Sequence, residues 1–411
     1  MGLTVPPEPT RPSKGRRRPA ERLHDVHISG IREVLEALTR WEGPGRVPVP
    51  FHLGMPDFDT PQHIKDALHA AVEAGFVRYT SSLGLPEARA AIARKLQREN
   101  GISADPEDAI VVTCGANEAI SATILALIDP GDEVIVPDPT WPHYEYCLRM
   151  AGAVPVRCQL HEDRGFTLEP DAVARLWSAR TRMVIINSPH NPTGAVMAPA
   201  DVLAIAHLAR DRGAWLLSDE AYERIVYDGE HLSPASLPDL GDTVLTVGCL
   251  SKAYAMTGWR LGYLCGPPAV VEAVNRVHLY SVTCAVSFVQ RAAIAALDGS
   301  QQCVETMRAE YRRRRDLIVE LLRDVPGMHV RVPSGAFYVF PNVTAFGRPS
   351  RELARYLVER AGVGVVHGSA FGPAGEGYLR IAYVCSEEQI REGVARMKRA
   401  LAELDPAIAR A

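Results

Sequence analysis

The chain has 411 residues, of which 47% are hydrophobic, and it carries a net charge of −4 at pH 7. Its length exceeds one average domain and its apolar content suffices for a large core, so we expect two units of unequal size. The small negative charge argues against a nucleic-acid partner, and no apolar run has the length of a membrane span or the pattern of a signal peptide.

The eight cysteines are scattered, without a C-x-x-C pair or the spacing of a disulfide framework. We interpret them as reduced thiols of a cytoplasmic protein, several of them core residues. The sequence also lacks a P-loop and any spacing typical of metal ligands, so we expect no metal.

The first twenty residues are rich in Pro and Arg and almost free of large apolar side chains. This composition predicts a disordered basic tail over residues 1–20. A basic contact arm is the alternative, whereas a cleaved organelle presequence is disfavoured because amphipathic periodicity is missing.

Short apolar runs alternate with helical stretches through the first three quarters of the chain. Such runs are typical of strands buried on both faces, and their alternation with helices predicts a mainly parallel sheet covered on both sides. The predicted strands are residues 109–113, 133–137, 154–157, 183–186, 215–217 and 243–247, with helices such as 118–127 and 198–212 between them.

The alternation of short apolar runs and helical stretches ends near residue 300, where a long charged helix is predicted over 304–323. A strand with one exposed face over 335–340 follows, and then helices over 350–361 and 387–404. This pattern predicts a smaller α+β domain over 299–411. A dinucleotide-binding fingerprint is excluded there, because Gly362 and Gly364 follow a helix and not a strand.

Lys252 is one of only five lysines in a chain with forty arginines. Where arginine is the usual cation, a retained lysine indicates chemistry that a guanidinium cannot perform, such as forming a Schiff base with a carbonyl.

The stretch from Ser251 to Gly262 resembles the lysine signature of class I/II aminotransferases, which are pyridoxal-phosphate enzymes of fold type I. Further motifs occur in the family's order between roughly residues 25 and 400: Gly54–Pro61, Tyr79-Thr80, Thr113–Glu118, Asn187–Gly194, Asp219–Tyr222 and Arg380.

The resemblance implies an α/β fold in which a large domain, residues 56–298, holds a mainly parallel seven-stranded sheet flanked by helices. It also implies that residues 21–55 join the small C-terminal domain, and that two copies form a homodimer with a composite active site.

The resemblance also assigns roles in cofactor chemistry. Lys252 would hold pyridoxal 5'-phosphate as a Schiff base and later move the substrate proton, which requires an uncharged amine. Asp219 lies at a strand end, where open α/β sheets bind ligands, and would keep the pyridine nitrogen protonated. Tyr222 and Asn191 would hydrogen-bond the cofactor's phenolate oxygen.

The phosphate would be held by donors that follow a strand and open a helix. Trp141 would stack on the pyridine ring. By resemblance the phosphate ligands are Gly115, Ala116, Asn117, Ser251 and Arg260, joined by Tyr79 from the second subunit.

The substrate α-carboxylate would be clamped by Arg380, with Gly54 and Asn191 completing the subsite. Two positions depart from the family pattern. Cys249 stands where a hydroxyl residue is frequent, and His367 stands where proline is usual.

We therefore predict an aminotransferase that moves the amino group of an L-amino acid to a 2-oxo acid by a ping-pong mechanism. Other pyridoxal-phosphate chemistry on the same fold remains open, as a β-lyase, a cyclase or an amino-acid oxidase, and a non-catalytic regulatory protein is the remote alternative. Asn117 stands where some aspartate aminotransferases place a lysine for a distal carboxylate, which disfavours an acidic substrate without excluding it.

Overall fold

The computed structural model describes residues 19–27, 30–41, 43 and 47–404. The predicted basic tail falls almost entirely outside these residues, as do Ile28 and Ser29 of the N-terminal segment. Within the described chain, no helix combines the length and the apolar character needed to cross a membrane.

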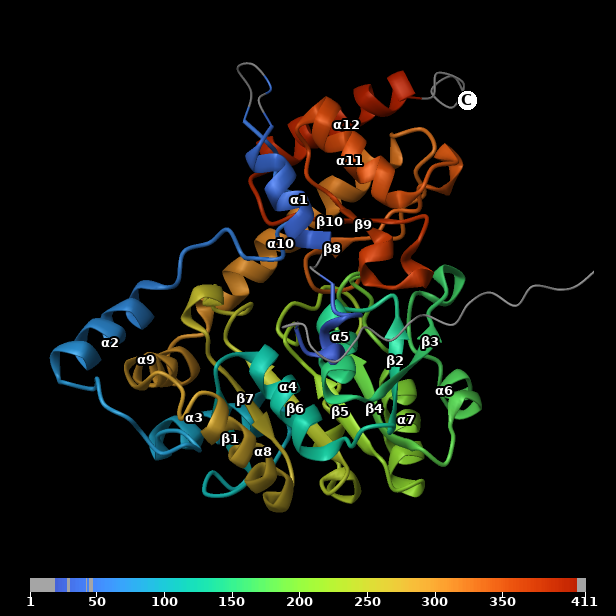
Figure 1. Ribbon diagram of the computed structural model, residues 1–411. Coiled ribbons are helices and arrows are strands. Elements are labelled where there is room, and N and C mark those ends of the chain that lie inside the picture. The colour runs from blue at the N-terminus through green and yellow to red at the C-terminus, as the bar shows by residue number, and fades with distance from the viewer. Residues whose placement is uncertain (1–18, 28–29, 42, 44–46, 405–411) are drawn as a thin grey trace, which may run out of the picture.

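The larger sheet of the described chain has seven strands in the order β1-β7-β6-β5-β4-β2-β3 (Figure 1). The strands from β2 to β6 pair in parallel, whereas β7 runs antiparallel to both of its neighbours. Their bounds are β1 Ile110–Thr113, β2 Glu133–Asp138, β3 Val154–Gln159, β4 Thr181–Asn187, β5 Trp215–Asp219, β6 Val244–Cys249 and β7 Gly262–Cys265. The predicted mainly parallel, seven-stranded sheet is thus confirmed.

Helices cover both faces of this sheet, as the buried clusters show. On one face lie α4 (Ala116–Leu127), α5 (Pro142–Ala151) and α8 (Pro268–Ser281). The other face carries α6 (Pro170–Leu176) and α7 (Pro199–Asp211). At the β1–β7 end, α2 (Gln62–Glu73), α3 (Pro86–Lys95) and α9 (Ser287–Asp298) complete the covering.

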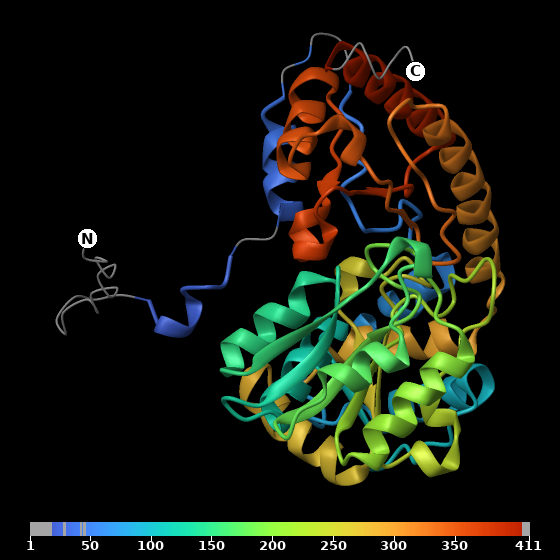
Figure 2. The ribbon, with the colours of Figure 1, turned by 90° about the vertical axis from the view of Figure 1, so that its right-hand side faces the viewer.

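The C-terminal part contains a three-stranded sheet in the order β8-β10-β9. Its strands are β8 (Tyr338–Val339), β9 (Val366–His367) and β10 (Leu379–Ala382), with helices α10 (Gln302–Arg323), α11 (Ser350–Ala361) and α12 (Glu387–Leu404). Figure 2 shows the N-terminal helix α1 (Gly30–Thr39) lying against α11, although the two are far apart in the chain. The predicted domain limits stay predictions.

The prediction of an exposed-faced strand over residues 335–340 is wrong. Only Tyr338 and Val339 form a strand, and every residue from Gly335 to Phe340 is buried. The segment lies inside the C-terminal hydrophobic core on one side and against the loop that follows β5 on the other, so neither face meets solvent. An apolar run of this length does not reveal from sequence how many of its faces are covered.

Candidate active site

A cavity of about 210 Å³ lies at the carboxyl ends of β4, β5 and β6, facing the three-stranded sheet. In parallel α/β sheets this edge is where ligands bind, because the strand ends and following loops converge there. Its lining includes Ile31, Gly54, Ala116, Asn117, Trp141, Tyr144, Asn187, Asn191, Asp219, Ala221, Tyr222, Cys249, Ser251, Lys252, Thr257, Arg260, Tyr338 and Arg380.

Lys252 follows β6 and extends across the cavity. Its Nζ donates a hydrogen bond of 2.7 Å to the carbonyl oxygen of Gly54 and lies 5.7 Å from the ring centre of Tyr222. Enclosure by the protein lowers the pKa of Lys252 to about 8, and the positive charges of Arg380 and Arg260 act in the same direction. A substantial fraction of this amine is therefore uncharged, and nucleophilic, just above neutral pH.

Asp219 is the last residue of β5 and is buried. The hydroxyl of Tyr144 donates to its Oδ2 over 2.5 Å, and the backbone N–H of Ala221 donates to its Oδ1 over 3.1 Å. Burial raises the pKa of Asp219 to about 6, while these two hydrogen bonds oppose the shift. The carboxylate is thus fixed in orientation, and a cationic partner in the cavity would be needed to favour its ionised form fully.

Arg380, on β10, is only 1% exposed. Its guanidinium donates to the carbonyl of His52 over 2.6 Å and to Oδ1 of Asn191 over 3.3 Å. Its Nε has no hydrogen-bond partner among the described residues. A buried arginine without a carboxylate is costly, so this side chain is held ready for an anion from outside the chain.

The turn between β1 and α4 brings the start of a helix to the cavity, where the backbone N–H groups of its first residues, Ala116 and Asn117, form an amide cup. Gly115 has φ +86°, and a Cβ on it would lie 2.6 Å from Nη2 of Arg260, so only glycine fits. The peptide of Cys114 is held on both sides, since its N–H donates to Glu118 over 2.6 Å and its carbonyl accepts from Arg260 over 3.2 Å. His278 in turn contacts Glu118 at 2.6 Å. A preformed amide cup beside an arginine suits a phosphate group.

Trp141 stands at the entrance to α5 and lines the cavity. Its ring stacks on that of His143 with 4.7 Å between centroids, and His143 contacts the carbonyl of Asn117 at 2.9 Å. Trp141 is therefore supported from behind while its ring borders the cavity.

Most of the site residues predicted from the sequence line the cavity, and Gly115 lies beside it in the turn that leads into α4. The clear exception is Tyr79, which is 86% exposed and lies outside the lining. Tyr144 and Tyr338 were missed, although Tyr144 lies only three residues after Trp141. Tyr338 carries no local signal, because it comes from the segment misread as an exposed strand.

The two departures from the family pattern have clear positions. Cys249 ends β6 and lines the cavity together with Ser251. His367 contacts Ser369 at 2.8 Å, and its Nε2 lies 2.6 Å from where a Cβ of Gly30 would be. The histidine thus packs against the start of α1, where glycine leaves room for it.

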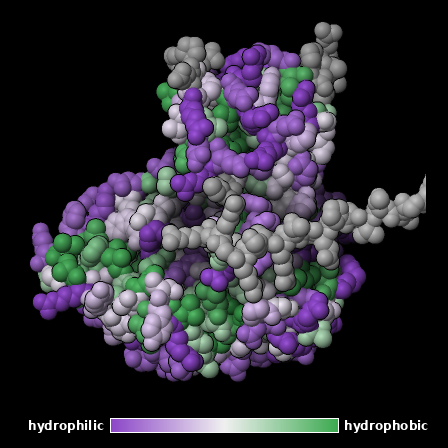
Figure 3. Space-filling model, in the orientation of Figure 1, coloured by the Kyte–Doolittle hydropathy of each residue, from purple (hydrophilic) through white to green (hydrophobic). Residues whose placement is uncertain are grey.

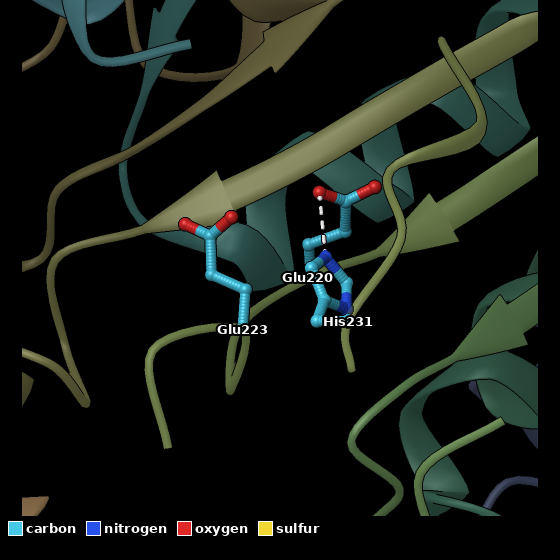
Figure 4. A group of neighbouring side chains, drawn as sticks. All are labelled: Glu220, Glu223 and His231. Carbon is cyan, nitrogen blue, oxygen red and sulfur yellow. Dashed lines mark hydrogen bonds and ion pairs between the residues drawn. The ribbon is translucent and has the colours of Figure 1, made fainter. Parts of the chain in front are cut away.

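A second polar cluster, formed by the buried Glu220 with the partly buried Glu223 and His231, follows β5 (Figure 4). His231 faces Glu220 at 3.3 Å, and the ammonium of Lys95 forms a close ion pair with Glu223. Asn100 donates to Glu220 over 3.0 Å. Because Lys95 already pairs with Glu223 and His231 with Glu220, we interpret the cluster as an internal ion-pair network and not as a cation site.

Comparison with known proteins places the chain. The family model described as Aminotransferase class I and II matches residues 48–397. The aromatic-amino-acid aminotransferase 2 of Thermococcus litoralis is 40% identical over 93% of this chain and 98% of its own, and so is the aspartate aminotransferase of Pyrococcus abyssi. The solved structure of Thermus thermophilus aspartate aminotransferase with maleate has a TM-score of 0.89 at 39% identity, covering 94% of this chain and 100% of its own.

The chain belongs to the class I and II aminotransferases. It is an enzyme that transfers amino groups, on the fold type I scaffold of a pyridoxal-phosphate-dependent family. These three relatives are all named aminotransferases, which favours transamination over the lyase, cyclase, oxidase and regulatory alternatives.

Proposed function

We propose that the cavity binds pyridoxal 5'-phosphate covalently through Lys252 and transfers amino groups between an L-amino acid and a 2-oxo acid by a ping-pong mechanism. The observation that carries this proposal is an imbalance of charge. Among the described residues, no carboxylate lies within ion-pair distance of Lys252, Arg260 or Arg380, although all three line one cavity.

The donor set fits each part of this cofactor. The amide cup at Gly115 and the guanidinium of Arg260 suit a phosphate dianion, and Trp141 offers a flat apolar surface for a ring. Asp219 suits a protonated ring nitrogen, because its raised pKa falls again beside a cation. The amine of Lys252, with its pKa near 8, suits an aldehyde.

The cofactor supplies an electron sink for the carbanion that forms when the substrate α-carbon loses its proton. The protein supplies orientation and proton transfer. Arg380 would bind the α-carboxylate in bidentate fashion and, with Asn191, fix which α-carbon bond faces Lys252. Once the substrate amine has taken the place of Lys252 on the cofactor, the freed lysine amine would accept and carry the α-proton of the substrate.

We further propose that the amino-acid side chain is uncharged. Lys252, Arg260 and Arg380 each have a partner in the scheme above, so among the described residues that line the cavity no cation remains for a distal carboxylate. At the position of Asn117 the chain offers only a neutral amide. Among the relatives, the aromatic-amino-acid enzyme fits this pocket better than the aspartate enzymes.

We also propose a homodimer in the cytoplasm, with Tyr79 reaching the phosphate of the partner's site. Support comes from an exposed apolar surface that includes Val77, Tyr79, Tyr280 and Val282. The hydroxyl of Ser287 donates a hydrogen bond of 2.7 Å to the carbonyl of Phe76, which holds the segment around Val77 and Tyr79 next to the start of α9. Figure 3 shows hydrophobic side chains gathered over α2, α4 and α8 on one face of the molecule. Large exposed apolar patches mark association surfaces.

The eight unpaired cysteines fit a reducing compartment, which supports the proposed location in the cytoplasm.

Borohydride reduction tests the proposal most directly. After incubation with pyridoxal phosphate, reduction should leave a stable adduct on the peptide that contains Lys252, and an amino acid with 2-oxoglutarate should turn over without release of ammonia or peroxide. Absence of the adduct would refute the assignment of the cavity. Ammonia or peroxide formed without a 2-oxo acid would favour a lyase or an oxidase.

Subunit mixing tests the composite site. Lys252→Ala and Tyr79→Ala chains, each nearly inactive alone, should recover activity when refolded together, because one site of each mixed dimer is then intact. Failure to recover activity in a proven mixed dimer would place Tyr79 outside the site.

A further inference from the structure

Tyr338 brings an unassigned hydroxyl to the wall of the cavity. The residue belongs to β8 and is 1% exposed, and its hydroxyl lies 2.8 Å from that of Tyr222. A Cβ on Gly54 would lie 2.4 Å from this oxygen, so glycine at position 54 leaves the space that the hydroxyl fills. The space is thus shaped for this hydroxyl.

The ring of Tyr338 has a second contact. The guanidinium carbon of Arg380 lies 4.6 Å from the ring centre, and the ring of Phe371 lies 4.9 Å from the same carbon. On the neighbouring strand β10, Tyr338 pairs with Ala382, two residues from Arg380, so the backbone places the two side chains on one face as diagonal neighbours. A guanidinium packed on aromatic faces keeps its planar fork in one orientation.

We propose that Tyr338 is a positioning residue for amino-group transfer: its hydroxyl orients Tyr222 toward the cofactor while its ring holds Arg380 for the substrate carboxylate. This inference rests on the proposed function, since it assumes that Tyr222 donates to the phenolate oxygen of the cofactor. Tyr222 has one proton to donate. Once that proton points at the cofactor, the Tyr222 oxygen must accept from Tyr338, and each bond in such a chain strengthens the next.

The Tyr338→Phe variant isolates the hydroxyl. With its hydroxyl partner lost, Tyr222 is a weaker donor, so the phenolate form of the cofactor is less stable. The pH at which the absorbance of the bound cofactor changes should then rise by about half a unit, the equivalent of one neutral hydrogen bond. The pH profile of kcat/KM should move in the same direction, while KM for the amino acid stays within about twofold because the ring remains.

Tyr383→Phe is the matched control, because Tyr383 is equally buried in the C-terminal core and its hydroxyl contacts a carbonyl away from the cavity. It should leave the absorbance titration unchanged. A Tyr338→Phe titration that coincides with the wild type and with this control overturns the role of the hydroxyl.

A double-mutant cycle with Tyr222→Phe separates positioning from a general structural effect. If Tyr338 acts through Tyr222, removal of its hydroxyl in the Tyr222→Phe background should cause no further shift. An equal shift in both backgrounds contradicts the proposal.

Tyr338→Leu isolates the ring. Loss of the aromatic face should raise KM for both the amino acid and the 2-oxo acid by about tenfold, since both present a carboxylate to Arg380. An unchanged KM overturns this half of the inference. In either case, a wild-type protein that still gives the borohydride adduct on Lys252 leaves the proposed function intact, whereas loss of that adduct is a failure of the proposed function itself.

Discussion

Asp219 and Glu220 are consecutive residues at the end of β5, and their carboxylates lie in opposite surroundings. Asp219 faces the cavity, where its side chain accepts hydrogen bonds from Tyr144 and a backbone amide but has no cationic partner within ion-pair distance among the described residues. Glu220 faces away from it, into a network in which His231, Ser233 and Asn100 all contact its oxygens.

The two buried lysines repeat this contrast. Lys95 lies among Glu223, Glu99 and Asn100, so its charge is matched inside the protein. Lys252 donates to a carbonyl oxygen and, among the described residues, has no carboxylate within ion-pair distance, and burial lowers its pKa to about 8. Matched buried charges indicate a structural element, whereas unmatched ones that converge on a cavity indicate a binding site whose ligand completes the balance.

The largest effect expected from this contrast concerns Lys252. Lys252→Arg keeps a cation in the cavity but removes an amine able to bond covalently or to carry a proton, so kcat should fall by at least about 10⁴-fold. The free energy of unfolding of the apoprotein should change by less than about 1 kcal/mol, because no ion pair is lost. Steady-state kinetics and urea unfolding measure the two quantities. Retention of more than one per cent of the activity would contradict the role of this lysine.

The neighbouring carboxylates should respond in opposite ways to neutralisation. Asp219→Asn should lower kcat on the order of 10²–10³-fold through lost charge stabilisation. In the apoprotein the raised pKa of Asp219, about 6 against 3.8, means that ionisation destabilises the folded state relative to the unfolded state as the pH rises above 3.8, with the full effect above about pH 6. The Asp219→Asn substitution should therefore stabilise the apoprotein by about 1–2 kcal/mol at pH 8.

Glu220→Gln is the matched partner of that experiment. Because it breaks a satisfied network, it should destabilise the protein by about 1.5–3 kcal/mol and leave kcat within a few-fold of the wild type. Equal stability changes for the two variants would show that the distinction between cavity and network is wrong.

The network itself is tested by Lys95→Met, which removes the cation and keeps much of the apolar stem. Leaving Glu223 buried without its partner should cost about 3–5 kcal/mol. Lys65→Met is the control, since Lys65 pairs with the exposed Asp59 and such surface pairs contribute about 0–1 kcal/mol. Chemical denaturation of both variants gives the comparison. A cost below about 1 kcal/mol for Lys95→Met would mean that the network is not a stabilising element.

The sequence predicts the cavity better than the network, and the reason is physical. Lys252, Asp219 and Arg380 lie in local motifs, because strand ends and tight turns impose short-range patterns on the residues around them. Lys95 and Glu223 are brought together from positions far apart in the chain by packing alone, so no spacing signals their contact. Tyr338 likewise meets Tyr222 from a distant part of the chain, so no local pattern signals its contact with the site.

The fold shows a similar limit. The parallel strands are apparent from their apolar runs, but β7 was missed, because Gly262–Cys265 is short and directly follows the lysine motif. Its antiparallel position between β1 and β6 depends on pairing with both neighbours, which a local pattern does not encode.

The smallest expected effect is the pH dependence of the network. Burial alone would lower the pKa of His231, but the hydrogen bond and charge of Glu220 outweigh burial and raise the pKa above 6.5. Burial alone would raise the pKa of Glu220, but contacts from His231, Ser233 and Ser218 outweigh burial and lower the pKa below 4.5. Stability from His231 is therefore complete below pH 6.5 and is lost as the pH rises through its folded-state pKa. Stability from Glu220 is complete above pH 4.5 and is lost as the pH falls through its own.

The pair should thus contribute most between pH 4.5 and 6.5. The difference in unfolding free energy between the wild-type apoprotein and His231→Gln should be about 1–2 kcal/mol in this window and should shrink as the pH rises through the folded-state pKa of His231. His207→Gln is a suitable control, because His207 contacts an exposed aspartate on the surface and should give a nearly flat difference. A His231→Gln difference that grows with rising pH would mean that this histidine is neutral in the folded protein, and that Lys95 and Asn100 alone compensate the charge of Glu220 and Glu223.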